Sequence, residues 1–206
     1  RWRRDSFPRV GKVLVIPAVL VAAGAIAVLA IGGVALLPFL GLALSAGLAV
    51  ASLLPLRDRK LRRTPLSVWG MVVAHFGIAV ALFGMSSEIA FTEERLVAVR
   101  IGEITQGGPW GVKLDAIEPV AGPNWTALQA RLLVRYGADG KVVRMLPQSR
   151  SFWTPPQQTS ESALLTRWNG QLYAVLGGEA PGNEGAGRWQ LRLWWKPFVS
   201  LIWIGG

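Results

Sequence analysis

A long run without a charged residue constrains the fold of this chain more than any other feature. It extends from Val13 to Leu56. A helix needs about 20 apolar residues to cross a bilayer, so the run is long enough for two crossings and too long for one. Gly32, Gly33 and Pro38 mark the turn between the two crossings. The sequence therefore predicts transmembrane helices over residues 13–31 and 34–54.

A third apolar run predicts a transmembrane helix over residues 66–86. Thr64-Pro65 precedes it, and a proline near the first helical turn costs little because its missing N–H has no helical partner there. The run ends at Ser86-Ser87-Glu88. A further transmembrane helix is expected to begin within residues 196–206, at an interfacial belt formed by Trp194-Trp195-Lys196-Pro197-Phe198.

The formal net charge of +10 indicates membrane topology. Two basic clusters flank the apolar runs, within residues 1–12 and 57–63. The positive-inside rule places both clusters in the cytoplasm, as a basic segment and a basic loop. Residues 87–195 then lie outside the cytoplasm, which is the periplasm in a Gram-negative bacterium. This stretch is nearly neutral, so no nucleic-acid partner is expected.

The external residues 87–195 predict a small antiparallel β domain. Leu128, Ala130, Leu132 and Val134 alternate with more polar residues, as in a half-buried strand, and Asp139-Gly140 predicts a hairpin after it. The expected strands cover residues 111–117, 127–136, 141–146, 171–176 and 189–195. One short helix is expected near residues 161–167. Barrel and sandwich both remain open.

His75 is the only histidine, and it falls in the middle of the third apolar run. An imidazole in hydrocarbon is expensive unless it has a partner, so this residue is a candidate for function. A stripe of small residues passes beside it, formed by Gly70, Ala74, Gly77, Ala81 and Gly84. Such a stripe allows another helix or a flat cofactor to approach the backbone. His75 is therefore either a packing residue that makes an interhelical hydrogen bond or an axial ligand of a haem iron.

The rest of the chain indicates little independent chemistry. The absence of cysteine excludes disulfides, thiolate metal sites and covalent attachment of haem to this chain. The adjacent Glu93 and Glu94 point in different directions, so they make a poor acid–base pair. No catalytic residue is expected. Five external tryptophans form either a hydrophobic surface or part of a core: Trp110, Trp125, Trp153, Trp168 and Trp189.

Five sets of segments carry a resemblance to a known family: Trp69 to Ala79, Gly122-Pro123-Asn124-Trp125, Leu146 to Arg150, Thr159 to Leu164 with Leu172 to Gly177, and Trp194 to Val199 with Ile202 to Gly205. In their order and spacing they resemble the C-terminal third of the CcmF family of cytochrome c biogenesis proteins. Gln148 and Ser149 depart from the family's Glu and Lys. The resemblance implies that His75 is one of two transmembrane histidines that ligate a b-type haem.

The resemblance also implies the setting of the complete protein. It is a multi-pass protein of the bacterial inner membrane that accepts haem from a carrier chaperone. With a thiol-handling partner subunit it attaches this haem to apocytochrome c, and quinol is a candidate electron source. The external domain is expected to serve as a docking surface for these partners.

This chain alone is not expected to be catalytic. It lacks the family's tryptophan-rich haem motif and its other haem-binding histidines, so we expect a piece of a longer protein. The alternative function is a membrane-anchored periplasmic scaffold or adaptor with no haem, in which His75 only packs.

Overall fold

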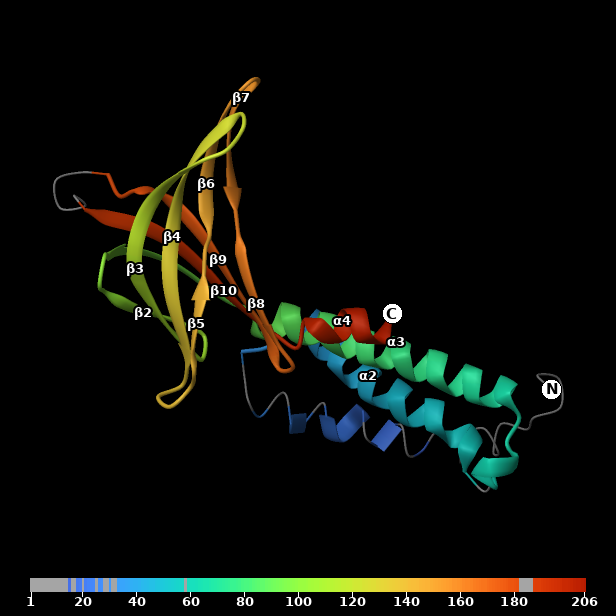
Figure 1. Cartoon of the computed structure of the whole chain (residues 1–206). Helices are drawn as coiled ribbons and strands as arrows, with labels where there is room; N and C mark the ends of the chain where they lie inside the picture. The colour runs from blue at the N-terminus through green and yellow to red at the C-terminus, as the bar shows by residue number, and fades with distance from the viewer. Residues whose placement is uncertain are drawn as a thin grey trace. The chain divides into compact units, whose positions relative to one another are not determined.

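The chain forms two compact units, which Figure 1 shows in a computed structural model. One unit comprises Arg1–Phe91 with Pro197–Gly206, and the other is Thr92–Lys196. The structure describes residues 15, 18–19, 21–24, 26–27, 30, 33–57, 59–181 and 187–206. The predicted basic segment 1–12 and much of the predicted helix 13–31 lie outside these residues. Those described between 15 and 30 are helical.

The first unit contains two long apolar helices, α2 (Leu36–Leu53) and α3 (Leu66–Phe91). Short 3-10 turns, η1 (Leu54–Leu56) and η2 (Leu61–Arg63), connect them. Both helices are long and apolar enough to cross a membrane. The Ser45 and Ser52 hydroxyls in α2 donate to the carbonyls of Leu42 and Leu48, at 2.7 and 2.6 Å. These bonds satisfy two hydroxyls that would otherwise be unpaired in an apolar helix.

Helix α3 continues beyond the end that the sequence suggested at residue 86. It runs through Ser86-Ser87-Glu88 to Phe91. Both serines are buried, and a Cβ added to Gly41 of α2 would collide with the Ser86 hydroxyl. The serine pair is therefore part of the contact between α2 and α3, where small side chains allow close approach, and it does not end the helix.

The last helix begins at Ser200, within the range expected, but the segment before it differs from the expectation. Strand β10 (Arg188–Pro197) runs through most of the residues that we interpreted as an interfacial belt, and α4 (Ser200–Gly205) follows it. The Trp195 side chain is 7% exposed and belongs to the β core, while the Trp194 ring packs edge-on against Tyr173 at 5.3 Å. Strand pairing with β1 explains the difference, because it turns alternate residues of this segment toward the core.

The second unit is an antiparallel β-sandwich. Its first sheet has the order β1-β10-β9-β8, and its second has the order β2-β3-β4-β6-β7, with β5 also paired to β4. The remaining strands are β1 (Glu93–Arg100), β2 (Ile104–Gly107), β3 (Trp110–Ala121), β4 (Trp125–Tyr136), β5 (Val142–Met145), β6 (Gln148–Trp153), β7 (Pro156–Glu161), β8 (Ala163–Arg167) and β9 (Gly170–Glu179).

The core of this unit lies between the two sheets, which identifies it as a sandwich. Leu132 and Val134 of β4 are fully buried, as are Leu172 and Leu176 of β9 in the other sheet. The alternation predicted for β4 is confirmed from Ala130 onward, and the Asp139-Gly140 hairpin joins β4 to β5. The predicted strands 111–117, 171–176 and 189–195 are parts of β3, β9 and β10, and the predicted strand 141–146 contains β5.

The helix expected near residues 161–167 is wrong. Residues Ala163–Arg167 form β8, which pairs with β9 in the register Leu164↔Tyr173. The local sequence Ala-Leu-Leu suits a helix, but a strand here extends the first sheet and lets Leu165 pack against the core. Tertiary pairing therefore overrides local propensity.

Candidate functional site

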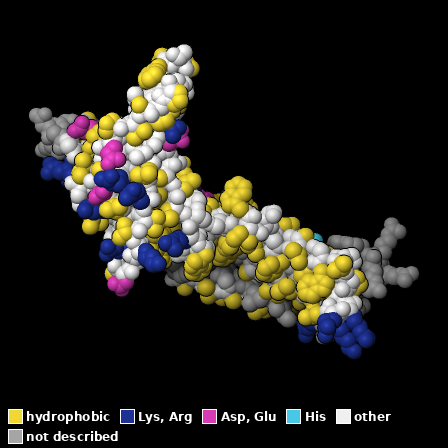
Figure 2. Space-filling model, viewed as in Figure 1, with side chains coloured by type: hydrophobic (Ala, Val, Ile, Leu, Met, Phe, Trp, Pro, Cys, Tyr) yellow, Lys and Arg dark blue, Asp and Glu magenta, His cyan; other side chains and the backbone are white. Residues whose placement is uncertain are grey.

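His75 lies on α3 with its imidazole exposed on the surface of the helical unit. Large apolar side chains surround it on the same helix, including Val73, Phe76 and Ile78, which are 64%, 39% and 56% exposed. Figure 2 shows hydrophobic side chains along this unit and Lys and Arg side chains at the end where α2 connects to α3. His75 is thus a polar group on an otherwise apolar helix surface.

The hydrogen bond of His75 fixes its tautomer. Nδ1 lies 2.8 Å from the carbonyl oxygen of Met71, one turn earlier on α3. A carbonyl can only accept, so Nδ1 carries the proton and donates it. In the neutral ring, Nε2 then holds the lone pair. Metal-binding histidines usually have this arrangement, in which one nitrogen donates to a backbone carbonyl or carboxylate and the other ligates.

A shallow pocket borders the imidazole between α2 and α3. Its volume is about 150 Å³, and it is lined by Leu48, Ala51, Ser52, Pro55, Met71 and His75. Pockets that enclose a ligand usually measure about 300–1,000 Å³, so this one is too small to enclose a porphyrin. A flat ligand of His75 would instead lie against the exposed apolar surface of the helix.

The small-residue stripe of α3 contacts another helix. A Cβ added to Gly77 would lie 2.6 Å from the Gly205 carbonyl oxygen, and one added to Gly84 would lie 2.9 Å from the Ile202 nitrogen. Helix α4 therefore occupies this part of the stripe. His75 borders the pocket with α2. Among the residues that the structure describes, nothing lies within 4 Å of a Cβ added to Gly70.

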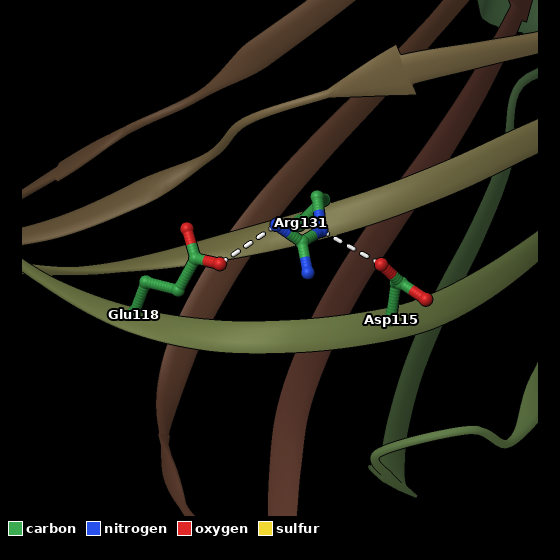
Figure 3. A network of polar contacts seen from close by, with 3 residues as sticks. All are labelled: Asp115, Glu118 and Arg131. Atoms are coloured by element: carbon green, nitrogen blue, oxygen red, sulfur yellow. Dashed lines mark hydrogen bonds and ion pairs between the residues drawn. The ribbon is translucent and has the colours of Figure 1, made fainter.

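The sandwich carries an ion-pair cluster that the sequence did not reveal. Arg131 of β4 bridges two carboxylates of β3, with Nε 2.7 Å from Asp115 and Nη1 2.7 Å from Glu118, as Figure 3 shows. The register of β3 shifts between Leu114 and Ala116, and this bulge leaves Asp115 unpaired and beside the arginine. The hydrogen bond to Asp115, and secondly the charge of Glu118, raise the pKa of Arg131 above its ordinary value.

This cluster has no catalytic geometry. Both carboxylates accept hydrogen bonds from the same Arg131 guanidinium, so the cluster is a structural ion-pair network that links β3 to β4. Glu93 and Glu94 are neighbours on β1, and they pair with Trp195 and Trp194. Within the residues that the structure describes, no group of three or more His, Asp or Glu side chains is arranged to hold a metal ion.

The five external tryptophans divide between core and surface. Trp110 is fully buried, and Trp189 packs against the core. Trp125 lies under the Arg150 guanidinium, 4.4 Å from the ring centroid. Trp153 and Trp168 are 55% and 83% exposed. The five tryptophans are therefore neither all core residues nor all parts of one hydrophobic surface.

Comparison with known families gives a match over the sandwich. The family model described as "CcmF C-terminal beta-sandwich" matches residues 90–197. These residues include nearly all of the β unit, so the match covers the same domain as the structure defines.

Several curated proteins are similar in sequence. The cytochrome c-type biogenesis protein CcmF of Escherichia coli (strain K12) is 32% identical over all of this chain and 32% of its own length. CcmF of Haemophilus influenzae is 29% identical over all of this chain and 33% of its own length. CycK of Bradyrhizobium diazoefficiens is 35% identical over 71% of this chain and 22% of its own length. The chain thus spans about a third of the length of the CcmF relatives that it matches.

A solved structure has the same fold. It is named "Cytochrome c Heme Lyase CcmF", and it superposes with a TM-score of 0.75 over all of this chain and 34% of that protein. The identity is 19%, so this likeness concerns the fold. It includes the helical unit as well as the sandwich.

Proposed function

The chain belongs to the CcmF family of cytochrome c biogenesis proteins, and we propose that it is the C-terminal part of a haem lyase subunit in which His75 is an axial ligand of a b-type haem. Membership of this family implies that the complete protein handles haem. The single observation that carries the assignment to His75 is its tautomer, which leaves Nε2 with a lone pair on an exposed apolar surface.

The residues around His75 fit a haem ligand. Met71 holds the imidazole through its carbonyl oxygen and thereby leaves Nε2 as the nitrogen that would ligate the iron. In a bilayer, the apolar side chains beside it would keep water away from that nitrogen. A b-type haem bound there supplies one-electron redox chemistry. The second axial ligand and the opposite wall of the site would come from outside this chain.

We propose that α2 and α3 cross the bacterial inner membrane. Both have the required length and hydropathy. The basic loop between them, with Arg57, Arg59, Lys60, Arg62 and Arg63, supports a cytoplasmic position for their connection. The sandwich, which follows the other end of α3, is then periplasmic. Residues 36–56 and 66–91 correspond to the second and third crossings in this topology.

The proposed partners follow from the family. In the complete protein, haem passes from a carrier chaperone to apocytochrome c with the help of a thiol-handling subunit, and quinol is the proposed electron donor. The sandwich is proposed as a docking surface for these partners. Loss of copurification on deleting residues 92–196 is the expected result, and unchanged copurification would exclude the docking role.

The second candidate function is a membrane-anchored scaffold without haem. Two observations favour it: Nδ1 of His75 already has a partner within its own helix, and Gly77 and Gly84 pack against α4. In this alternative the histidine needs no further ligand, and the complete protein is colourless.

A reduced absorption spectrum of the full-length protein tests the proposal. Wild type should show b-type bands after dithionite, and His75→Ala should lose or shift them. Met71→Leu is the matched control, because it changes the neighbouring side chain and retains the carbonyl that orients the imidazole. A colourless wild type, or unchanged bands in His75→Ala, would favour the scaffold.

A further inference from the structure

Both connections to the helical segments leave the sandwich at one end. Helix α3 ends at Phe91 and strand β1 begins at Glu93, so only Thr92 separates them. Glu93 pairs with Trp195 near the end of β10, and α4 begins at Ser200 shortly after. We call this the tethered end of the sandwich.

Two further segments lie at the tethered end, the loop between β4 and β5 and the turn between β8 and β9. The β9–β10 hairpin closes at its other end, where the Ala180 N–H donates to the Arg188 carbonyl at 2.8 Å. Strand β9 therefore begins at the tethered end, directly after the turn. Tyr136, which precedes the β4–β5 loop, also belongs here, because the Trp110 ring lies 4.9 Å from its ring and 6.3 Å from that of Trp195.

These two segments form a pocket of about 370 Å³. Its lining consists of Tyr136, Gly140, Lys141, Arg167, Trp168 and Asn169. Two cationic side chains, an amide and two aromatic rings therefore line it, and no carboxylate does. Asn169 donates to the Tyr136 hydroxyl at 3.1 Å, which joins the turn to β4.

Trp168 is the most exposed tryptophan of the sandwich, at 83%, and Tyr136 is 43% exposed. A tryptophan at the tip of a turn gains nothing from core packing, so its exposure needs another explanation. Tryptophan and tyrosine are enriched where protein meets the membrane–water interface, because one end of each ring is apolar and the other is polar. Lysine and arginine bind anionic headgroups at the same level.

We propose that this pocket binds the phosphate of an anionic phospholipid headgroup through Lys141 and Arg167, while Trp168 inserts beside it at the level of the headgroups. The inference rests on the proposed membrane anchoring of α3 and is independent of haem. The covalent tether keeps this end of the sandwich within a few residues of the helices. The positive charges of Lys141 and Arg167 favour a negatively charged phosphate. The exposed ring of Trp168 favours a lipid headgroup over a free phosphate ion.

Headgroup quenching of tryptophan fluorescence tests the position of Trp168. The chain is reconstituted in nanodiscs that contain lipid with a nitroxide on the headgroup, and the quenched signal is compared between wild type and Trp168→Phe. Trp153→Phe is the matched control, because Trp153 is also exposed but lies away from the tethered end. Its neighbour Phe152 pairs with Trp125, the first residue of β4, whereas Tyr136 at the tethered end is the last. We expect the Trp168 component to be quenched at least twofold more than the Trp153 component. Equal quenching would overturn the proposal.

The lipid composition tests the chemistry. Replacing part of the phosphatidylcholine by phosphatidylglycerol should increase the quenching of Trp168, and the double variant Lys141→Gln/Arg167→Gln should abolish the increase. The same charge change at Arg100 and Lys113 should leave it intact. Excess inorganic phosphate should not compete, and loss of the increase in its presence would overturn the lipid assignment. A missing haem spectrum would leave all these expectations unchanged.

Discussion

At the scale of single residues, the sequence identified His75 but not its surroundings. The sequence alone shows a single histidine within an apolar run. Because burying an imidazole in hydrocarbon is costly, such a residue is a candidate for function. Which helix lies beside it depends on how α2 and α3 pack, and the sequence pattern alone does not give this. The structure places α2 residues in the pocket at His75. The Met71 partner was in reach of sequence reasoning, since it lies one turn away.

The ion pairs of Arg131 give a prediction at the same scale. Arg131→Gln leaves Asp115 and Glu118 without their shared cation, so the melting temperature of the sandwich should fall, and less so at high salt. The pKa of Arg131 is raised in the folded state, so this stabilisation is fully present below its ordinary pKa and is lost only as the pH rises through the folded value. The decrease should therefore be the same at pH values of about 7 and 10.

Thermal unfolding followed by circular dichroism measures the effect. The control is Arg95→Gln, which removes an arginine that donates to the Gln106 carbonyl at 3.3 Å and should change the melting temperature less. Equal decreases in the two variants would show that the two carboxylates contribute nothing through Arg131.

At the scale of elements, the sequence predicted strands where one face alternates and missed those where it does not. Strand β4 is visible in the sequence because the fully buried Ala130, Leu132 and Val134 alternate with residues that are less buried. Strands β6 and β7 carry no buried residue, so no alternation marks them. They form because Gln148↔Glu161 and the pairs that follow extend the sheet by backbone hydrogen bonds.

The helix contact between α3 and α4 gives a prediction for elements. Gly77→Ala places a methyl group against the Gly205 backbone, so α4 must move, and overpacking of this kind costs about 1–3 kcal/mol. Gly70→Ala on the same stripe meets no atom within 4 Å and should stabilise the helix by about 0.5–1 kcal/mol. Unfolding in mixed detergent micelles measures both changes. A destabilised Gly70→Ala with an unaffected Gly77→Ala would contradict this packing.

At the scale of the whole molecule, two units with separate cores account for the composition. The helical unit exposes apolar side chains such as Leu36, Leu44 and Val73, whereas the sandwich encloses its own core. This division was predictable, because charge patterning separates the two parts of the sequence. The number of sheets was not predictable, since it depends on pairing between strands that are distant in the sequence, such as β1 and β10.

The separate core predicts that residues 92–196 fold without the helices. This domain should unfold cooperatively in urea. Leu132→Ala should destabilise it by about 2–5 kcal/mol, because the side chain is fully buried between the sheets. Leu164→Ala, at a position that is 54% exposed, should cost less than half as much. A domain that is unfolded on its own, or equal effects of the two substitutions, would contradict an independent core.

The position of β10 also determines when the first sheet can be completed during translation. This strand lies between β1 and β9 in the first sheet, yet it is the last strand of the sandwich to leave the ribosome. Until then β1, the first strand made, lacks its partner, and its unpaired edge is open to misassociation. Helix α4, which packs on Gly77 and Gly84, emerges later still. The nascent chain therefore completes its first sheet and its helix contact almost together, at the end of translation of this segment, and the edge of β1 stays unpaired until then.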